Sequence, residues 1–120
     1  MTLATIGLGV RHADAITGLT AAAAFLETHP DLPLSPIGDP LNVSVRVGSD
    51  QEKRAEVDRI AEILGVQAGY IYGSRTHYAA ILSFSGGVTY KATAISGSYL
   101  DDYDAGRSYL GSVSQMRGAA

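Results

Sequence analysis

"THYAAILSFSGGVTYKATAI", residues 76–95, contains two alternating runs of apolar and polar residues that meet at a pair of glycines. Alternation with a period of two is typical of strands with one buried face, and a glycine-containing loop between two such runs predicts a β-hairpin. A three-residue loop, Ser85 to Gly87, pairs Leu82 with Tyr90, whereas a two-residue turn would set Leu82 opposite Lys91. We therefore expect the longer loop, with one apolar and one polar face.

The same faces continue into a preceding strand, "QAGYIYG", residues 67–73. A loop of Gly73 to Arg75 sets Tyr70 opposite Tyr78 and brings Tyr72 to the same face. The apolar face then carries Tyr70, Tyr72, Tyr78, Leu82, Phe84 and Tyr90, and the polar face carries His77, Ser83, Thr89, Lys91 and Thr93. The remaining hairpin pairs are Phe84 with Val88, Ala80 with Ala92, and Tyr78 with Ala94.

A helix is predicted over residues 49–65, because Ser49 and Glu52 form a capping box and Gly65 suits a left-handed C-terminal residue. Its buried stripe is Val57, Ile60, Ala61 and Leu64. Its charged residues are expected on a solvated face: Glu52, Lys53, Glu56, Arg59 and Glu62.

An earlier helix is expected to begin at the cap Asp14 and to end before Pro30. Its apolar stripe, Ile16, Leu19, Ala23 and Leu26, has helical spacing. Between the two helices, "LNVSVRV", residues 41–47, alternates as a half-buried strand. It sets Leu41, Val43, Val45 and Val47 on one side, and Asn42, Ser44 and Arg46 on the other.

These elements predict an α+β fold, a two-layer sandwich in the order α-β-α-β-β-β with a four-stranded, mostly antiparallel sheet. Both helices should cover the tyrosine face, which alone is apolar enough to receive them, with the tyrosine hydroxyls at the rim. A right-handed crossover should join the first strand to the second in parallel. Residues 1–95 form this domain, with 1–12 as an N-terminal extension. The Gly/Ser/Tyr/Asp-rich tail, 96–120, is expected to be flexible when the protein is alone.

Composition narrows the possible functions. The chain has 120 residues, a formal net charge of −3 and no cysteine. The negative net charge argues against a protein that binds nucleic acid through many phosphate contacts. The absence of cysteine excludes disulfides and cysteine chemistry. His12, His29 and His77 have no metal-ligand spacing, and the sequence contains no phosphate-binding glycine loop. We therefore expect a cytoplasmic, non-membrane protein that is not an enzyme, with no catalytic residue, cofactor or metal.

Two surfaces are candidates for binding another protein, or for self-association. One is the polar sheet face with Arg46, His77 and Lys91. The other is the tail, where Tyr99, Tyr103 and Tyr109 lie in and around a repeated Ser-Tyr-Leu. The alternative is a nucleic-acid-binding protein that uses Arg46, Arg75, His77 and Lys91, or a tyrosine face that stacks bases. A third interpretation is a small-molecule site assembled from dispersed polar residues.

"EKRAEVDRIAEILGV", "THYAAILSF" and "GGVTYKATAI" together resemble an uncharacterised family of small proteins from actinobacteria and their phages. The resemblance covers about residues 20–95 and includes "FLETHPDLPL". It implies a phage, mobile-element or host accessory protein and carries no known activity. The predicted function is thus a non-enzymatic accessory module that binds another protein.

Overall fold

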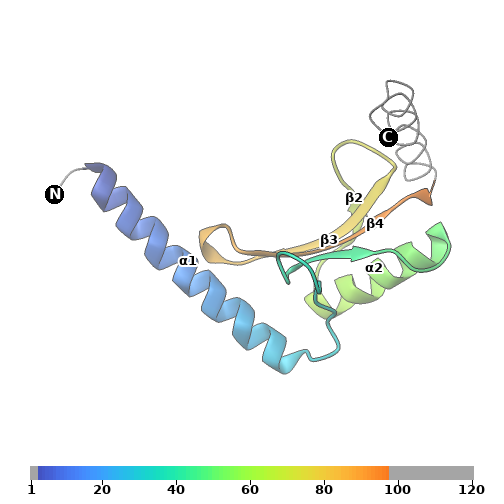
Figure 1. Cartoon of the computed structure of the whole chain (residues 1–120), viewed down its shortest axis with the longest axis horizontal. Helices are drawn as coiled ribbons and strands as arrows, with labels where there is room; N and C mark the ends of the chain where they lie inside the picture. Colours follow the sequence, from blue (N-terminus) through green and yellow to red (C-terminus); the bar gives the residue numbers. More distant parts are fainter. Residues whose placement is uncertain (1–2, 98–120) are drawn as a thin grey trace, which may run out of the picture.

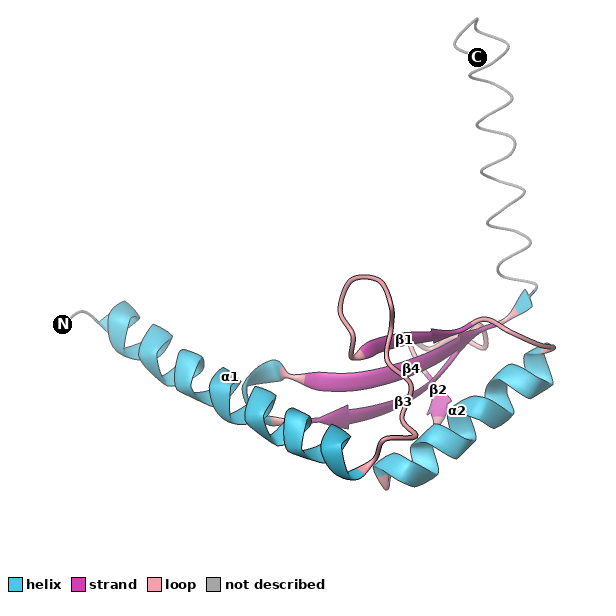
Figure 2. Cartoon of the chain, turned by 60° about the horizontal axis from the view of Figure 1, so that its bottom comes forward, coloured by secondary structure: helices cyan, strands magenta, loops and turns pink. Residues whose placement is uncertain are grey.

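The computed structural model describes residues 3–97, with side chains from Arg11 onward. Two helices and four strands follow the predicted order, and the chain has an α+β fold. The elements are α1 (Leu3–Thr28), β1 (Asn42–Val45), α2 (Asp50–Leu64), β2 (Gly69–Tyr70), β3 (His77–Ser83), a short 3-10 turn η1 (Ser85–Gly87) and β4 (Thr89–Ile95). Both helices lie on one side of the sheet (Figures 1 and 2).

The β3–β4 hairpin has the predicted register. Leu82 pairs with Tyr90, Ala80 with Ala92 and Tyr78 with Ala94. The Phe84 N–H donates to the Val88 carbonyl at 2.7 Å, which closes the three-residue loop. Gly86 has φ +70°, a conformation that an L side chain rarely adopts, so glycine at this position explains why the loop can form.

The sheet order is β1-β4-β3-β2, so the first strand does not neighbour the second. β1 and β2 do run parallel, as predicted, but at opposite edges, and β1 pairs with β4 instead. The reason is length: β2 has two residues, whereas β4 has seven and is paired on both sides. The strand predicted over 67–73 is thus much shorter. The strand predicted over 41–47 ends at Val45, and Val47 is 87% exposed.

Helix α2 supplies the centre of the core. The capping box of Ser49 and Glu52 is formed, and Gly65 ends the helix with φ 72°. The predicted stripe of Val57, Ile60, Ala61 and Leu64 is buried. It packs where the apolar sheet face carries small side chains, Ala80, Ala92 and Ala94. Small residues allow the helix to approach the sheet closely, while tyrosines surround this contact.

Two tyrosines of this face place their hydroxyls at the rim, as predicted. Tyr90 is 2% exposed, and its hydroxyl donates to the Pro33 carbonyl at 2.6 Å. Tyr78 donates to Asp58 Oδ1 at 2.6 Å. Burial raises the pKa of Tyr90 to about 12, and the hydrogen bond to Asp58 raises the pKa of Tyr78. The rings of Tyr90 and Tyr78 therefore pack in or against the core and are not open for bases to stack on.

Helix α1 differs from the prediction in its start and in its buried stripe. It begins at Leu3, so Asp14 lies inside the helix and is no cap, and it ends at Thr28 as Pro30 requires. Ile16 and Leu19 of the predicted stripe are 53% and 56% exposed. In Figure 1 the N-terminal half of the helix extends beyond the hairpin.

The buried stripe of α1 is instead Gly18, Ala22 and Phe25, which faces the hairpin loop. A Cβ at Gly18 would lie 1.9 Å from the Ser85 carbonyl oxygen, so only a residue without a side chain fits there. Phe25 packs edge-on against Phe84 at 6.2 Å between ring centroids. Close approach to a backbone loop therefore selects small residues. Of the predicted stripe, only Leu26 packs against the core.

Replacing Phe25 should cost far more stability than replacing Leu19, although sequence spacing suggests the reverse. We expect Phe25→Ala to lower the free energy of unfolding by about 2–3 kcal/mol, because it removes a ring packed on the core. Leu19→Ala should change it by less than about 0.5 kcal/mol. Urea denaturation of both variants measures this, and equal losses would contradict the packing described for α1.

Candidate functional site

The face of the sheet opposite the helices is the open face. Strand register sets its side chains in rows that cross the sheet. One row contains Asn42, Lys91 and Ile81; the next contains Ser44, Thr93, Ala79 and Gly69; the third contains Ile95 and His77, with Arg46 beside them beyond β1. Within residues 3–97, both helices lie on the other side of the sheet (Figure 2).

Lys91, His77 and Tyr72 form a cluster on the open face. Lys91 Nζ donates to the Tyr72 hydroxyl at 2.7 Å and lies 5.0 Å from the Tyr72 ring centroid. The Tyr72 ring meets the His77 imidazole edge-on at 5.7 Å between centroids, and Thr76 Oγ1 lies 2.9 Å from His77 Nδ1. Tyr72 is 74% exposed, so the cluster presents an aromatic surface next to a cation.

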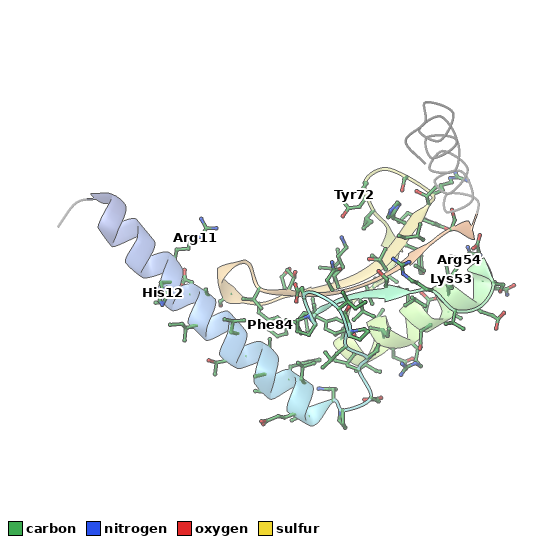
Figure 3. The ribbon with its side chains drawn as sticks, viewed as in Figure 1. Arg11, His12, Lys53, Arg54, Tyr72 and Phe84 are labelled. Carbon is green, nitrogen blue, oxygen red and sulfur yellow. The ribbon has the colours of Figure 1, made fainter. Side chains whose placement is uncertain are left out.

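The position of Tyr72 corrects the prediction that its ring shares the core face with Tyr70 and Tyr78. Tyr70 does pair with Tyr78, but Tyr72 has φ +61° and starts a tight turn with Gly73, also at φ +61°. The Ser74 N–H donates to the Ile71 carbonyl across this turn. Two successive left-handed residues break the alternation of a strand, so Tyr72 reaches the opposite face (Figure 3).

The open face has a floor of small side chains. Ala79 is 3% exposed and Thr93 7% exposed, between the longer Lys91 on one side and His77 on the other. A cavity of about 10 Å³ lies beside Thr93, lined in part by Ser44 and Arg46. Ligand pockets are typically hundreds of Å³ in volume, so this cavity is too small to hold a metabolite.

The open face adjoins a groove of about 740 Å³ at the free edge of β1. One wall is the connector from Pro33 to Ile37, and the other is β1 with the following Arg46. Ile37 is 84% exposed. Edge strands present backbone N–H and C=O groups that can pair with a further strand. The groove therefore combines a hydrogen-bonding edge, apolar side chains and a cation.

The predicted site residues fall into two groups. Arg46, His77 and Lys91 lie together on the open face, and exposed Arg75 precedes β3. Tyr99, Tyr103 and Tyr109 lie outside the described residues, as does nearly all of the tail. Sequence reasoning missed Tyr72, for which the Tyr-Gly pair in front of Ser74 was an available turn signal.

Lys53 also departs from the prediction, since it is 4% exposed and not on a solvated face. Its Nζ donates to the Ile95 carbonyl at 2.7 Å and lies 3.4 Å from Asp50 Oδ1. Asp50 Oδ1 accepts from the Gly97 N–H at 2.7 Å. Lys53 precedes Val57 by one helical turn, so it belongs to the buried stripe of α2. Together Asp50 and Lys53 fix the end of β4 to the start of α2.

Residues 3–97 contain no group of three or more side chains that could together hold a metal ion. Neither helix in this part of the chain combines the length and apolar content that a membrane crossing requires. No family model, curated protein or solved structure matches the chain.

The contact between Asp50 and Gly97 predicts a specific loss of stability in acid. The Gly97 N–H, with help from Lys53, lowers the pKa of Asp50 below its ordinary value of 3.8. A lowered folded-state pKa contributes stability above the unfolded value, and this contribution is lost as the pH falls through the folded pKa. Between about pH 5 and pH 2, the free energy of unfolding should fall more steeply in the wild type than in Asp50→Asn.

Urea titrations across this range measure the two slopes. Glu62→Gln, at an exposed position on the same helix, is the matched control and should keep the wild-type slope. If Asp50→Asn and the wild type lose stability in parallel, the contact with Gly97 does not stabilise the fold.

Proposed function

We propose that the chain is a non-enzymatic accessory module that binds an acidic, extended segment of another protein on its open face and along the edge of β1. The main support is charge: the open face carries Lys91, Arg46 and His77. In the described residues, the four strands contain no carboxylate, and every Asp and Glu lies on α1, α2 or a connector. A chain of net charge −3 thus presents a basic surface on one side of its sheet.

The edge of β1 supports a protein partner over nucleic acid. An extended peptide can add a strand to an open sheet edge, with affinity from main-chain hydrogen bonds and specificity from side-chain pockets. Here the connector Pro33 to Ile37 supplies an apolar wall next to that edge, and Arg46 supplies a cation where the groove joins the open face. Nucleic acid would use the cation but not the strand edge.

Nucleic-acid binding is the second candidate, and exposed Tyr72 is the observation that favours it. An accessible ring beside Lys91 and His77 is suited to stacking a single-stranded base. Against it, Tyr72 is the one aromatic side chain of the described residues placed in this basic cluster. We also propose a cytoplasmic setting, from the cysteine-free composition, and a phage or mobile-element origin, from the family resemblance alone.

Site-specific photocrosslinking in the full chain tests this function. A benzophenone side chain at Ile81, which is 39% exposed on the open face, should crosslink to a protein in a lysate of the source organism, and nuclease should not remove the product. The same probe at exposed Glu62 of α2 is the matched control. Crosslinks to nucleic acid alone would favour the second candidate, and products no different from those of the Glu62 control would contradict both.

Charge removal then tests the basic surface with any partner so found. Lys91→Gln should weaken its binding by about threefold to tenfold, since one interface cation contributes on the order of 1 kcal/mol. Arg59→Gln removes the same charge from α2, where Arg59 pairs with Glu56, and should leave binding unchanged. Equal effects of the two variants would show that net charge, and not this face, governs binding.

A further inference from the structure

Three arginines gather where the chain leaves the sheet. Arg46 follows β1 and Arg75 precedes β3, so they flank the end of β4, whose Ala94 pairs with Val45. Thr76, next to Arg75, accepts a hydrogen bond from the Ser96 N–H at 2.8 Å. Arg54 of α2 lies at the same end (Figure 3). It lines a small cavity with Arg75 and Ser96. We call Arg46, Arg54 and Arg75 the basic end of the sheet.

The described residues form no ion pair with these three arginines. The ion pairs among residues 3–97 are Lys53 with Asp50 and Arg59 with Glu56, so none of the three arginines has an ion-pair partner there. Asp50, one helical turn before Arg54 on α2, attracts the Arg54 charge, but its carboxylate is already bonded to Gly97 and Lys53. Like charges that share a small region repel one another, so a nearby anion would stabilise this end.

The sequence supplies such anions a few residues after the last described residue. Asp101 is four residues beyond Gly97, and Asp104 is seven, with Asp102 between them. A chain spans at most about 3.3–3.6 Å per residue, so the three carboxylates can reach roughly 13–25 Å from Gly97. Strands in a sheet are about 4.8 Å apart, so both arginines that flank β4 lie within this reach.

We propose that the acidic run Asp101, Asp102 and Asp104 binds back onto the basic end of the sheet, at Arg46, Arg54 and Arg75, and so competes with an acidic partner. Charge complementarity and the short tether identify the occupant. A tethered segment of this length has an effective concentration in the millimolar range, which favours it over a second copy of the chain at ordinary protein concentration. Only the competition depends on the proposed function; the contact itself does not.

NMR of the full chain tests the contact without any partner. The triple variant Asp101→Asn, Asp102→Asn, Asp104→Asn should shift the amide and side-chain N–H signals of Arg46, Arg54 and Arg75 while the rest of β3 and β4 stays unchanged. About 1 M NaCl should shift the same signals in the wild type, because salt screens exposed charges. The matched control replaces three exposed carboxylates of the body, Asp14→Asn, Asp31→Asn and Glu62→Gln, and should leave these signals in place.

Two results would overturn the contact. The first is that the triple Asp→Asn variant, here called the tail variant, has the same arginine signals as the wild type. The second is that the wild-type signals move with protein concentration, which would identify a second copy as the occupant.

A labelled hexa-aspartate peptide tests the competition separately. It should bind the tail variant about threefold to tenfold more tightly than the wild type, since the tethered competitor has lost its charge. The control variant gains the same net charge and should bind the peptide as the wild type does. Another outcome is that the arginine signals shift in the tail variant while the peptide binds none of the proteins. That result would support the contact and refute the acidic-partner function. Peptide binding that is equal in all three proteins would refute the competition.

Discussion

The close packing of α2 against alanines at the centre of the β3–β4 hairpin is the contact on which the rest of the structure depends. Val57, Ile60 and Leu64 of the helix can bury their side chains because Ala80 and Ala92 face them. The same register sends the alternate residues of both strands to the other side. Among residues 3–97, a sheet whose helices cover one face therefore follows from one helix and one hairpin.

Charge is divided between the two sides of this sheet. Carboxylates of the described residues lie on the helices and connectors, while Lys91 and Arg46 lie on or beside the open face. The acidic net charge of the chain hides this division, because composition sums over surfaces that point in opposite directions. Hydrogen bonds from Lys53 to the Ile95 carbonyl and from the Gly97 N–H to Asp50 join α2 to the end of β4.

The fold class, the register of the hairpin and both caps of α2 could be predicted from the sequence, because each depends on local spacing. Three features could not. Tyr72 changes face through left-handed turn residues, and α1 buries glycine and alanine because a loop comes close. Lys53 can be buried because the Ile95 carbonyl of β4 accepts a hydrogen bond from its Nζ. The burial of α1 and of Lys53 depends on contacts between segments distant in the chain, whereas the turn at Tyr72 is local. On the open face, Arg46, His77 and Lys91 were predictable from alternation, whereas Tyr72 was not.

The accessibility of the open face in the full chain is the central claim, and thiol labelling measures it most directly. The protein contains no cysteine, so Ile81→Cys introduces a single reactive group on that face, and Ala80→Cys introduces one on the core face of the same strand. Our account predicts that the thiol at position 81 reacts nearly as fast in the folded protein as in urea, while the thiol at position 80 is protected. Protection at both positions would show that another part of the chain covers the face, and would contradict the account.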